Sequence, residues 1–213
     1  MGMEIGPKDV FIVVDVQNDF TTGSMAIAGS ESIIEPINVT AEIFEHVVVV
    51  TDWHPADHVS FASAHEGAAH GDTVAVPYGE QRVWNDHCVQ GTEGAELDPG
   101  LKLDKAELVF RKGYRTAVDS YGAFYENDVV TPTGLGAYLK GRGIERVFVA
   151  GLARYGCAMQ TALGAAKDGF DVFLVDDAAG GRPADPDAEA ASMATIADAN
   201  IGWVTSTDFV AAS

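Results

Sequence analysis

The sequence predicts an α/β protein, a single domain over residues 1–213 with a doubly wound, Rossmann-like sheet of six parallel strands and helices on both faces. Three observations predict this fold. Short runs rich in valine and isoleucine recur along the chain, and they are almost continuously apolar, as strands buried on both faces are. Segments of helical pattern alternate with these runs, which is typical of parallel sheets. The length of 213 residues suits one large domain of this kind.

The expected strands are the apolar runs of the chain. The first ends at Val14 and is short and β-branched, and the second holds four consecutive valines before Thr51. The later runs are equally short and apolar. In chain order, the six expected strands are residues 9–14, 47–51, 108–110, 146–149, 172–175 and 203–205.

The expected helices lie between these strands, at residues 31–45, 134–140, 157–167 and 187–199. Ser30 is the expected N-cap of the first helix, in which Pro36 is an irregularity. Gly141 or Gly143 is expected to end the second helix. Pro186 lies near the start of the last, alanine-rich helix, a position that proline favours.

Two long segments, residues 59–100 and 114–128, show no clear periodicity and are expected to be loops. The first holds Trp84 and the pair His87-Cys88, so it is interpreted as a functional loop region rather than a linker. No Gly-x-Gly-x-x-Gly motif follows a strand, so the sequence lacks the signature of dinucleotide binding.

The charge balance excludes several classes of partner. The chain has 32 acidic and 13 basic residues, a formal net charge of −19, so nucleic acid and anionic membranes are not expected partners. The first apolar run, residues 10–14, is too short to cross a membrane or to form a signal core. Two cysteines do not make a disulfide framework. We therefore expect a cytoplasmic protein with a small-molecule partner.

Cys157 has the placement of a nucleophile. It follows the expected strand at 146–149 and begins the helix at 157–167. Ligands bind at the carboxyl ends of parallel strands, and a helix start favours a thiolate, so a lowered pKa is expected for this thiol. The alternative is a small apolar residue packed at a helix end.

Asp15 and Lys112 also follow expected strands, and they make chemical sense together with Cys157. The carboxylate would take the thiol proton as general base, and the ammonium would stabilise the thiolate and hold the carboxylate. The backbone amides of Ala153 and Cys157 would form an oxyanion hole. The alternatives are a strand-end cap for Asp15 and a solvated surface charge for Lys112.

Asp52, His54 and His87 have the ligand types of a divalent metal site with open coordination positions. His58 is a candidate fourth ligand or a neighbouring group that supports the others. The alternative for His87 is an ordinary loop residue. The remaining histidines, His46, His65 and His70, have no comparable setting and are expected at the surface.

Three aromatic residues lie close in sequence to these polar groups: Phe20, Trp84 and Tyr121. They are expected to wall a pocket for a flat substrate. Anchoring of the long loops explains them equally well.

Taken together, these segments resemble the isochorismatase-like cysteine hydrolases, and within that family the nicotinamidase/pyrazinamidase branch. The matching residues span most of the chain in the family's order. They are Asp15-Val16-Gln17-Asn18-Asp19-Phe20, residues 52–62 beginning Asp-Trp-His-Pro, residues 84–92 beginning Trp-Asn-Asp-His-Cys, Arg111-Lys112-Gly113, residues 119–124, and Gly151-Leu152-Ala153 leading to Cys157.

The resemblance implies an amidase that hydrolyses nicotinamide to nicotinate and ammonia through a cysteine thioester. Asp15 would match the general base, Lys112 the stabilising lysine and Cys157 the nucleophile. The metal ligands would be Asp52, His54 and His87, with His58 as a fourth ligand that only some members have.

Further properties follow from the same resemblance. The cofactor would be one divalent metal ion that holds the pyridine nitrogen, with zinc expected first and iron or manganese as alternatives. The Leu152–Ala153 peptide would match a cis bond that shapes the oxyanion hole. Because members of the family are commonly oligomeric, we expect a homo-oligomer.

The chain departs from the family at Arg154-Tyr155-Gly156, where Thr-Asp and an aromatic, aliphatic or histidine residue are usual, and at Gly122, where serine is common. A related amidase that acts on a carbamoyl, maleamic or ureido compound therefore remains an alternative. Two further alternatives are a hydrolase whose metal-bound hydroxide attacks, and a sensor or scaffold that binds without turnover.

Overall fold

The computed structural model describes residues 2–181 and 185–211, and a sheet of six parallel strands lies at its centre. The strands are β2 (Asp9–Val14), β3 (His46–Asp52), β6 (Leu108–Lys112), β7 (Arg146–Gly151), β8 (Asp171–Ala179) and β9 (Gly202–Val204). They lie in the order β6-β3-β2-β7-β8-β9, so the chain starts in the middle and winds outward in both directions. This confirms the doubly wound fold and all six expected strands.

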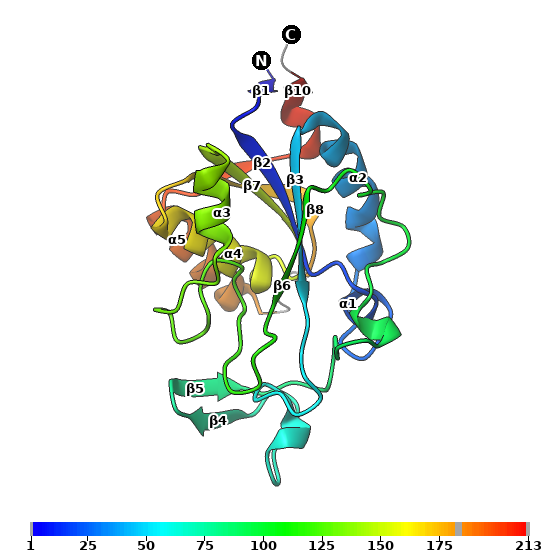
Figure 1. The fold of residues 1–213 in the computed structure, drawn as a ribbon, viewed down its shortest axis with the longest axis vertical. Helices are drawn as coiled ribbons and strands as arrows, with labels where there is room; N and C mark the ends of the chain where they lie inside the picture. Colours follow the sequence, from blue (N-terminus) through cyan, green and yellow to red (C-terminus); the bar gives the residue numbers. More distant parts are fainter. Residues whose placement is uncertain (1, 182–184, 212–213) are drawn as a thin grey trace.

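Helices cover both faces of the sheet (Figure 1). Successive strand residues point alternately into two hydrophobic cores, one on each face. Phe11 of β2 faces α2 (Ile34–Ile43), where it packs in the same core as Ile37. Ile12 points the other way, toward α3 (Leu135–Gly141), α4 (Cys157–Lys167) and α5 (Pro186–Asp198). Burial on both faces explains why these strands are apolar at successive positions.

The first expected helix is divided and has a different cap. A 3-10 turn, η1 (Ser30–Ile33), comes before α2, and the residue that precedes it, Gly29, has the left-handed φ of 79°. Ser30 is therefore inside the first turn instead of capping it. Pro36 lies in the first turn of α2, where its missing N–H removes no helical hydrogen bond.

Several short elements were not expected from the sequence. An antiparallel hairpin, β4 (Thr73–Val76) and β5 (Gly79–Arg82), lies within the segment expected to be a loop. A parallel pair, β1 (Met3–Ile5) and β10 (Phe209–Ala211), joins the two ends of the chain (Figure 1). The others are α1 (Asn18–Thr21), η2 (Ala62–Ala64), η3 (Glu93–Ala95) and η4 (Ser206–Asp208).

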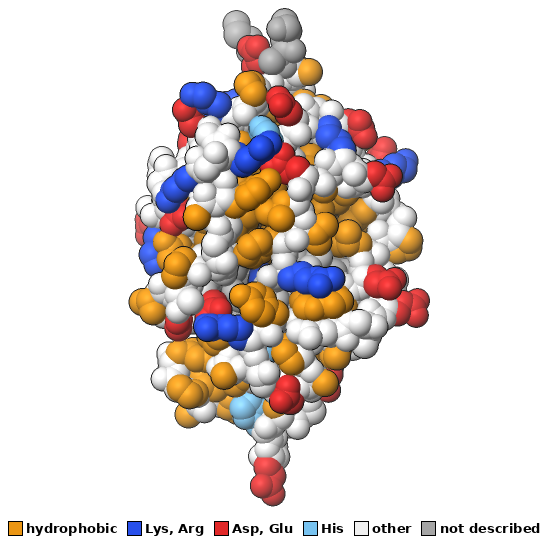
Figure 2. Space-filling model, viewed as in Figure 1, with side chains coloured by type: hydrophobic (Ala, Val, Ile, Leu, Met, Phe, Trp, Pro, Cys, Tyr) orange, Lys and Arg blue, Asp and Glu red, His pale blue; other side chains and the backbone are white. Residues whose placement is uncertain are grey.

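The predicted surface position is wrong for one of the three remaining histidines. His46 was expected to be exposed, but it is 7% exposed and its Nδ1 lies 2.8 Å from Glu107 Oε2. His65 is half-buried and His70 is exposed. Apolar side chains lie among charged ones on the face that carries the edge strand β6, where Val109 is 56% exposed (Figure 2). Among the described residues, no helix combines the length and apolar character that a membrane crossing requires.

Candidate active site

The carboxyl ends of four strands bring the expected catalytic residues together. Asp15 follows β2, Asp52 ends β3, Lys112 ends β6 and Cys157 opens the helix after β7. The register places Asp52 opposite Lys112 on neighbouring strands. Four neighbouring parallel strands therefore bring four distant chain segments together at the carboxyl edge of the sheet.

Lys112 connects the carboxylates of this edge. Its Nζ lies 2.6 Å from Asp52 Oδ1 and 2.8 Å from Asp15 Oδ2, and the residue is 1% exposed. Burial lowers the pKa of the ammonium, but the charges of Asp15 and Asp52 outweigh this effect and hold the pKa well above its ordinary value. Lys112 is thus a buried cation paired with two anions, not the solvated charge of the alternative interpretation.

Asp15 has the setting of a general base. Its backbone takes the left-handed φ of 54°, and its amide donates to the Val50 carbonyl at 2.9 Å. Burial and the charge of Asp52 raise the pKa of its carboxyl to about 7, although Lys112 acts in the opposite direction. Its Oδ1 is buried and has no hydrogen-bond donor among the described residues. A carboxylate of this kind is poised to accept a proton near neutral pH.

Cys157 lies beside that carboxylate, and ligand atoms of Cys157, Asp15 and Asp52 all lie within 4.8 Å of one another. The expected low pKa is wrong. Burial raises the pKa of the thiol well above its ordinary value, and the charges of Asp15 and Asp52 add to this effect, against Lys112. The helix start does not compensate for burial between two carboxylates. The resting group is therefore a thiol that needs a neighbouring base.

Backbone hydrogen bonds to the Ala153 carbonyl close the turn before α4. Gly156 N and Ala158 N donate to the Ala153 carbonyl at 2.8 and 3.2 Å. Among the described residues, the amides of Ala153 and Cys157 have no acceptor within the protein. The Leu152–Ala153 peptide is cis, as the family resemblance implied. The two amides expected to form an oxyanion hole are thus available to a ligand.

Asp52, His54 and His87 offer ligand atoms within 4.8 Å of one another. His54 Nε2 lies 3.5 Å from Asp52 Oδ1, and His87 Nε2 lies 3.9 Å from Asp52 Oδ2. The Nδ1 atoms face the carbonyls of Gly113, at 2.8 Å, and Asn85, at 2.7 Å. Donation from Nδ1 leaves the Nε2 lone pairs for a metal, which is how proteins orient histidine ligands. The donor set fits a divalent ion such as zinc.

Gly113 is required for this orientation. It has a φ of +63°, and a Cβ there would lie 2.4 Å from His54 Cε1. Only glycine allows the backbone to approach the imidazole so closely while it accepts the Nδ1 hydrogen bond.

His58 lies beside this group but outside it. Its Nδ1 is 2.7 Å from Ser60 Oγ, and its Nε2 is 3.3 Å from the Val118 carbonyl. Its ring stacks on that of His54 with centroids 4.2 Å apart. It shares a cluster of ligand types with His54 and Asp119, not with Asp52 and His87. Its interpretation as a fourth ligand stays a prediction, and its contacts favour a supporting role.

A cavity of about 290 Å³ joins the thiol to the metal-ligand set. The three aromatic residues expected to wall a pocket, Phe20, Trp84 and Tyr121, all line it. The ring of Phe20 lies 5.3 Å from that of His87. The cavity has room for a small flat ring between apolar walls, with the thiol and the metal ligands both within its lining.

Other lining residues were not expected from the sequence: Met25, Ile27, Leu152 and Asp119. Asp119 was part of a recognised segment, so its position could have been proposed. Met25 and Ile27 follow the short helix α1, and no local pattern marks them.

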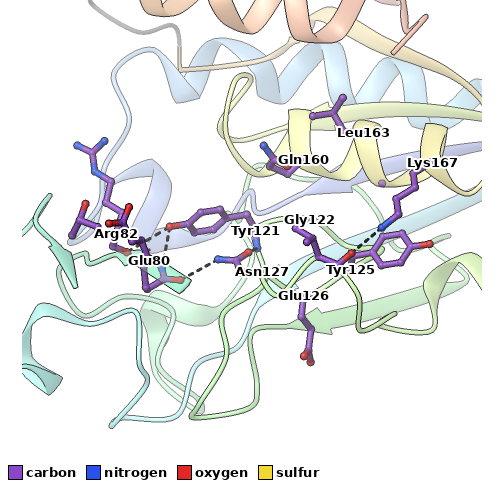
Figure 3. Close-up of a pocket in the computed structure, with 14 residues that line it drawn as sticks. Glu80, Arg82, Tyr121, Gly122, Tyr125, Glu126, Asn127, Gln160, Leu163 and Lys167 are labelled. Carbon is purple, nitrogen blue, oxygen red and sulfur yellow. Dashed lines mark hydrogen bonds between the residues drawn. The ribbon is translucent and has the colours of Figure 1, made fainter. Parts of the chain in front are cut away.

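Gln81 is a further residue that sequence reasoning missed. It is 1% exposed, and its Nε2 donates to Asp119 Oδ2 and to the Tyr121 hydroxyl, both at 3.0 Å. Tyr121 also lines a separate groove of about 520 Å³ between α4 and the β4–β5 hairpin (Figure 3). Gln81 therefore fixes the side chain that separates the cavity from this groove. Its segment, Gly79–Arg82, is polar and gives no sequence signal.

The chain is similar to known proteins in both sequence and structure. A family model described as the isochorismatase domain matches residues 9–209. The nicotinamidase of Acinetobacter baylyi is 49% identical over 168 residues, which is 78% of each chain. Among solved structures, an Acinetobacter baumanii nicotinamidase/pyrazinamidase has a TM-score of 0.92 and 42% identity, covering 95% of this chain and 98% of that one.

Two further structures carry ligands that bear on the site. PnC1 of L. infantum in complex with nicotinate has a TM-score of 0.86 and 34% identity, covering 100% of both chains. The pyrazinamidase of Pyrococcus horikoshii in complex with zinc has a TM-score of 0.75 and 29% identity, covering 93% of this chain and 99% of that one.

Proposed function

The chain belongs to the isochorismatase family and is an amidohydrolase, and from this premise we propose that it hydrolyses nicotinamide to nicotinate and ammonia. The observation that carries the proposal is an apolar cavity whose lining holds both the Cys157 thiol and the Asp52, His54 and His87 side chains. A pyridine ring with a carboxamide substituent has a ring nitrogen for the metal-ligand end of this cavity and a carboxamide for the thiol end. The nicotinate complex of the L. infantum relative supports the same substrate class.

The first half of the reaction forms an acyl-enzyme. Asp15 takes the proton of the Cys157 thiol as the sulfur bonds to the amide carbon, and the carbonyl electrons move to oxygen. The amides of Ala153 and Cys157 hydrogen-bond that oxyanion. When the intermediate collapses, Asp15 returns the proton to the departing nitrogen. Ammonia leaves, and a thioester remains on Cys157.

In the second half of the reaction, water is the nucleophile and the Cys157 sulfur is the leaving group. Asp15 takes a proton from water, whose oxygen bonds to the thioester carbon. The same two amides hold the second oxyanion, and collapse breaks the carbon–sulfur bond. The proton on Asp15 passes to the leaving sulfur, and the nicotinic acid formed loses its carboxyl proton to water and is released as nicotinate. Lys112, 2.8 Å from Asp15, holds the carboxylate in place and balances the negative charge of the thiolate.

The metal ion proposed for this chain would be held by Asp52, His54 and His87. When bound, the ion supplies a Lewis-acid contact for the ring nitrogen of the substrate and so orients the carboxamide toward Cys157. Zinc is the expected ion, supported by the zinc complex of the P. horikoshii relative, with iron and manganese as alternatives. The protein itself supplies the apolar walls, of which Phe20 and Tyr121 are part.

The experiment that tests the proposal compares two amides on the metal-replete protein. Nicotinamide should give nicotinate and ammonia in equal amounts, detected by proton NMR and an ammonia assay. Benzamide has the same shape but no ring nitrogen, so it should be hydrolysed with a much higher KM. Absence of nicotinate formation from nicotinamide would refute the proposed function. Equal KM values for the two amides would refute the role of the metal.

A further inference from the structure

Arg154, one of the residues that depart from the family pattern, does not line the cavity. It follows Ala153 in the turn between β7 and α4, and it is 4% exposed. A buried guanidinium next to an expected oxyanion-hole residue needs a reason, because an unpaired buried charge is costly.

Within the described part of the chain, the hydrogen bonds of the Arg154 side chain run to the end of β8. One terminal nitrogen, Nη1, pairs with the Asp176 carboxylate, and the other, Nη2, donates to the Asp176 carbonyl. Its Nε donates to the Ala179 carbonyl at 3.0 Å. All three nitrogens of the guanidinium are therefore engaged by two residues of one strand.

Backbone hydrogen bonds reinforce this attachment. The Arg154 amide donates to the Gly180 carbonyl at 2.6 Å, and the Gly180 amide donates to the Gly151 carbonyl at 3.1 Å. Gly180 thus holds both ends of the segment 151–154, and Ala153 lies inside that segment. The side chain of Arg154 fastens the same segment to β8 a second time.

We propose that Arg154 is a positioning residue for the oxyanion hole: through Asp176 and Ala179 it holds the Ala153 amide in the orientation that receives the oxyanion. The inference rests on the proposed function. A planar fork with several donors suits this task, and a lysine, with one point charge, cannot reproduce its three contacts. Arg154 acts through the backbone and touches neither substrate nor metal.

The other explanation is that Arg154 only stabilises the fold. Arg146 provides a matched control, because it lies at the opposite end of β7 and forms a similar pair. Its Nε and Nη2 donate to Asp9 Oδ1 and Oδ2 at 2.6 and 2.5 Å. Loss of either arginine removes an arginine–aspartate pair near one end of β7, but only Arg154 is next to the oxyanion hole.

The test uses Arg154→Met, Arg154→Lys and Arg146→Met, with kinetics on nicotinamide and inhibition by pyridine-3-carbaldehyde. The aldehyde carbon bonds to the Cys157 sulfur while the thiol proton passes to Asp15, and the resulting alkoxide needs the Ala153 and Cys157 amides. Loss of one oxyanion donor lowers kcat by about 10²–10³-fold, so a displaced donor should cost about 10–100-fold. Both Arg154 variants should lose kcat in this range and aldehyde affinity by a similar factor, with KM changed less than about threefold.

Arg146→Met should lower the melting temperature but leave kcat and aldehyde affinity unchanged. If Arg154→Met does not fold, Arg154→Lys distinguishes positioning of the oxyanion hole from stabilisation of the fold, because it keeps a positive charge beside Asp176. An Arg154→Lys protein with kcat and aldehyde affinity within about twofold of the parent would overturn the inference, as would losses that Arg146→Met reproduces.

Hydrogen exchange separates this inference from the proposed function. Without any substrate, the amides of residues 151–158 should exchange faster in Arg154→Met than in Arg146→Met. A parent protein that does not hydrolyse nicotinamide refutes the proposed function. Equal exchange in the two variants refutes the positioning by Arg154.

Discussion

Lys112 and Asp52 form the contact that joins the two halves of the site. The Lys112 ammonium donates to Asp52 Oδ1 at 2.6 Å, and the second oxygen of the same carboxylate faces His87 Nε2 at 3.9 Å. Asp52 thus belongs both to the metal-ligand set and to the charge network of the nucleophile. The charges of Lys112, His54 and His87 hold its pKa far below the ordinary value, although burial acts in the opposite direction.

Lys112→Met should remove activity and destabilise the fold. The change leaves the buried carboxylates of Asp15 and Asp52 without their cation, and breaking a buried pair in this way costs roughly 3–5 kcal/mol. Urea unfolding measures the loss, and Lys8→Met is the control, since the Lys8–Glu145 pair is 64% exposed on both sides. A Lys112→Met protein as stable as the control would contradict the account.

Gly113→Ala should weaken metal binding by about 10–100-fold, because the new Cβ displaces the His54 ring and its Nδ1 contact. Chelator competition with the zinc-loaded protein measures the affinity. Gly143→Ala is the matched control. Gly143 has a similar φ of 77°, but a Cβ there has no heavy atom within 4 Å. If both variants bound zinc equally well, the close approach of Gly113 to His54 would be irrelevant to the site.

The pH dependence of kcat/KM should follow the Asp15 carboxyl. Burial and Asp52 raise its pKa from 3.8 to about 7. The base must be ionised to take the thiol proton, so kcat/KM should fall about tenfold per pH unit below pH 7 and level off above it. A rate profile measured with nicotinamide tests this. A plateau extending to about pH 5 would show that Asp15 keeps an ordinary pKa or is not the base.

Alkylation of Cys157 by iodoacetamide should be slow at neutral pH, because burial between two carboxylates raises the pKa of the thiol. The rate should increase with pH. A Cys88→Ser background leaves Cys157 as the single thiol of the chain, so intact-mass measurement reports its labelling alone. Rapid labelling at pH 6 would indicate a resting thiolate and would argue against proton transfer to Asp15.

Most of the sheet and the composition of the site were predictable from the sequence. Valine-rich strands such as β3 are apolar because both faces are covered, and parallel strands place Asp15, Asp52, Lys112 and Cys157 at one edge. The β4–β5 hairpin was missed because β5 is polar and largely exposed. Its buried residue, Gln81, acts through Tyr121 and Asp119, which are far away in sequence.

Electrostatic properties were less predictable, because they depend on partners that only the fold brings together. A helix start suggested a low pKa for Cys157, but burial raises the pKa instead, and the charges of Asp15 and Asp52 from other chain segments add to this effect. His46 is buried because it pairs with Glu107, 61 residues away. The cytoplasmic location, the homo-oligomer and the role of His58 stay predictions.

The most direct test of the account is nicotinamide turnover by Cys157→Ala, measured as ammonia release from metal-replete protein beside the parent chain. The account predicts that the parent is active and that the variant, although folded and able to bind metal, shows no release above background. It also predicts a nicotinoyl thioester on Cys157 in acid-quenched parent protein. A Cys157→Ala protein that keeps most of the activity would contradict the account and would favour attack by a metal-bound hydroxide, with Cys157 in a structural role.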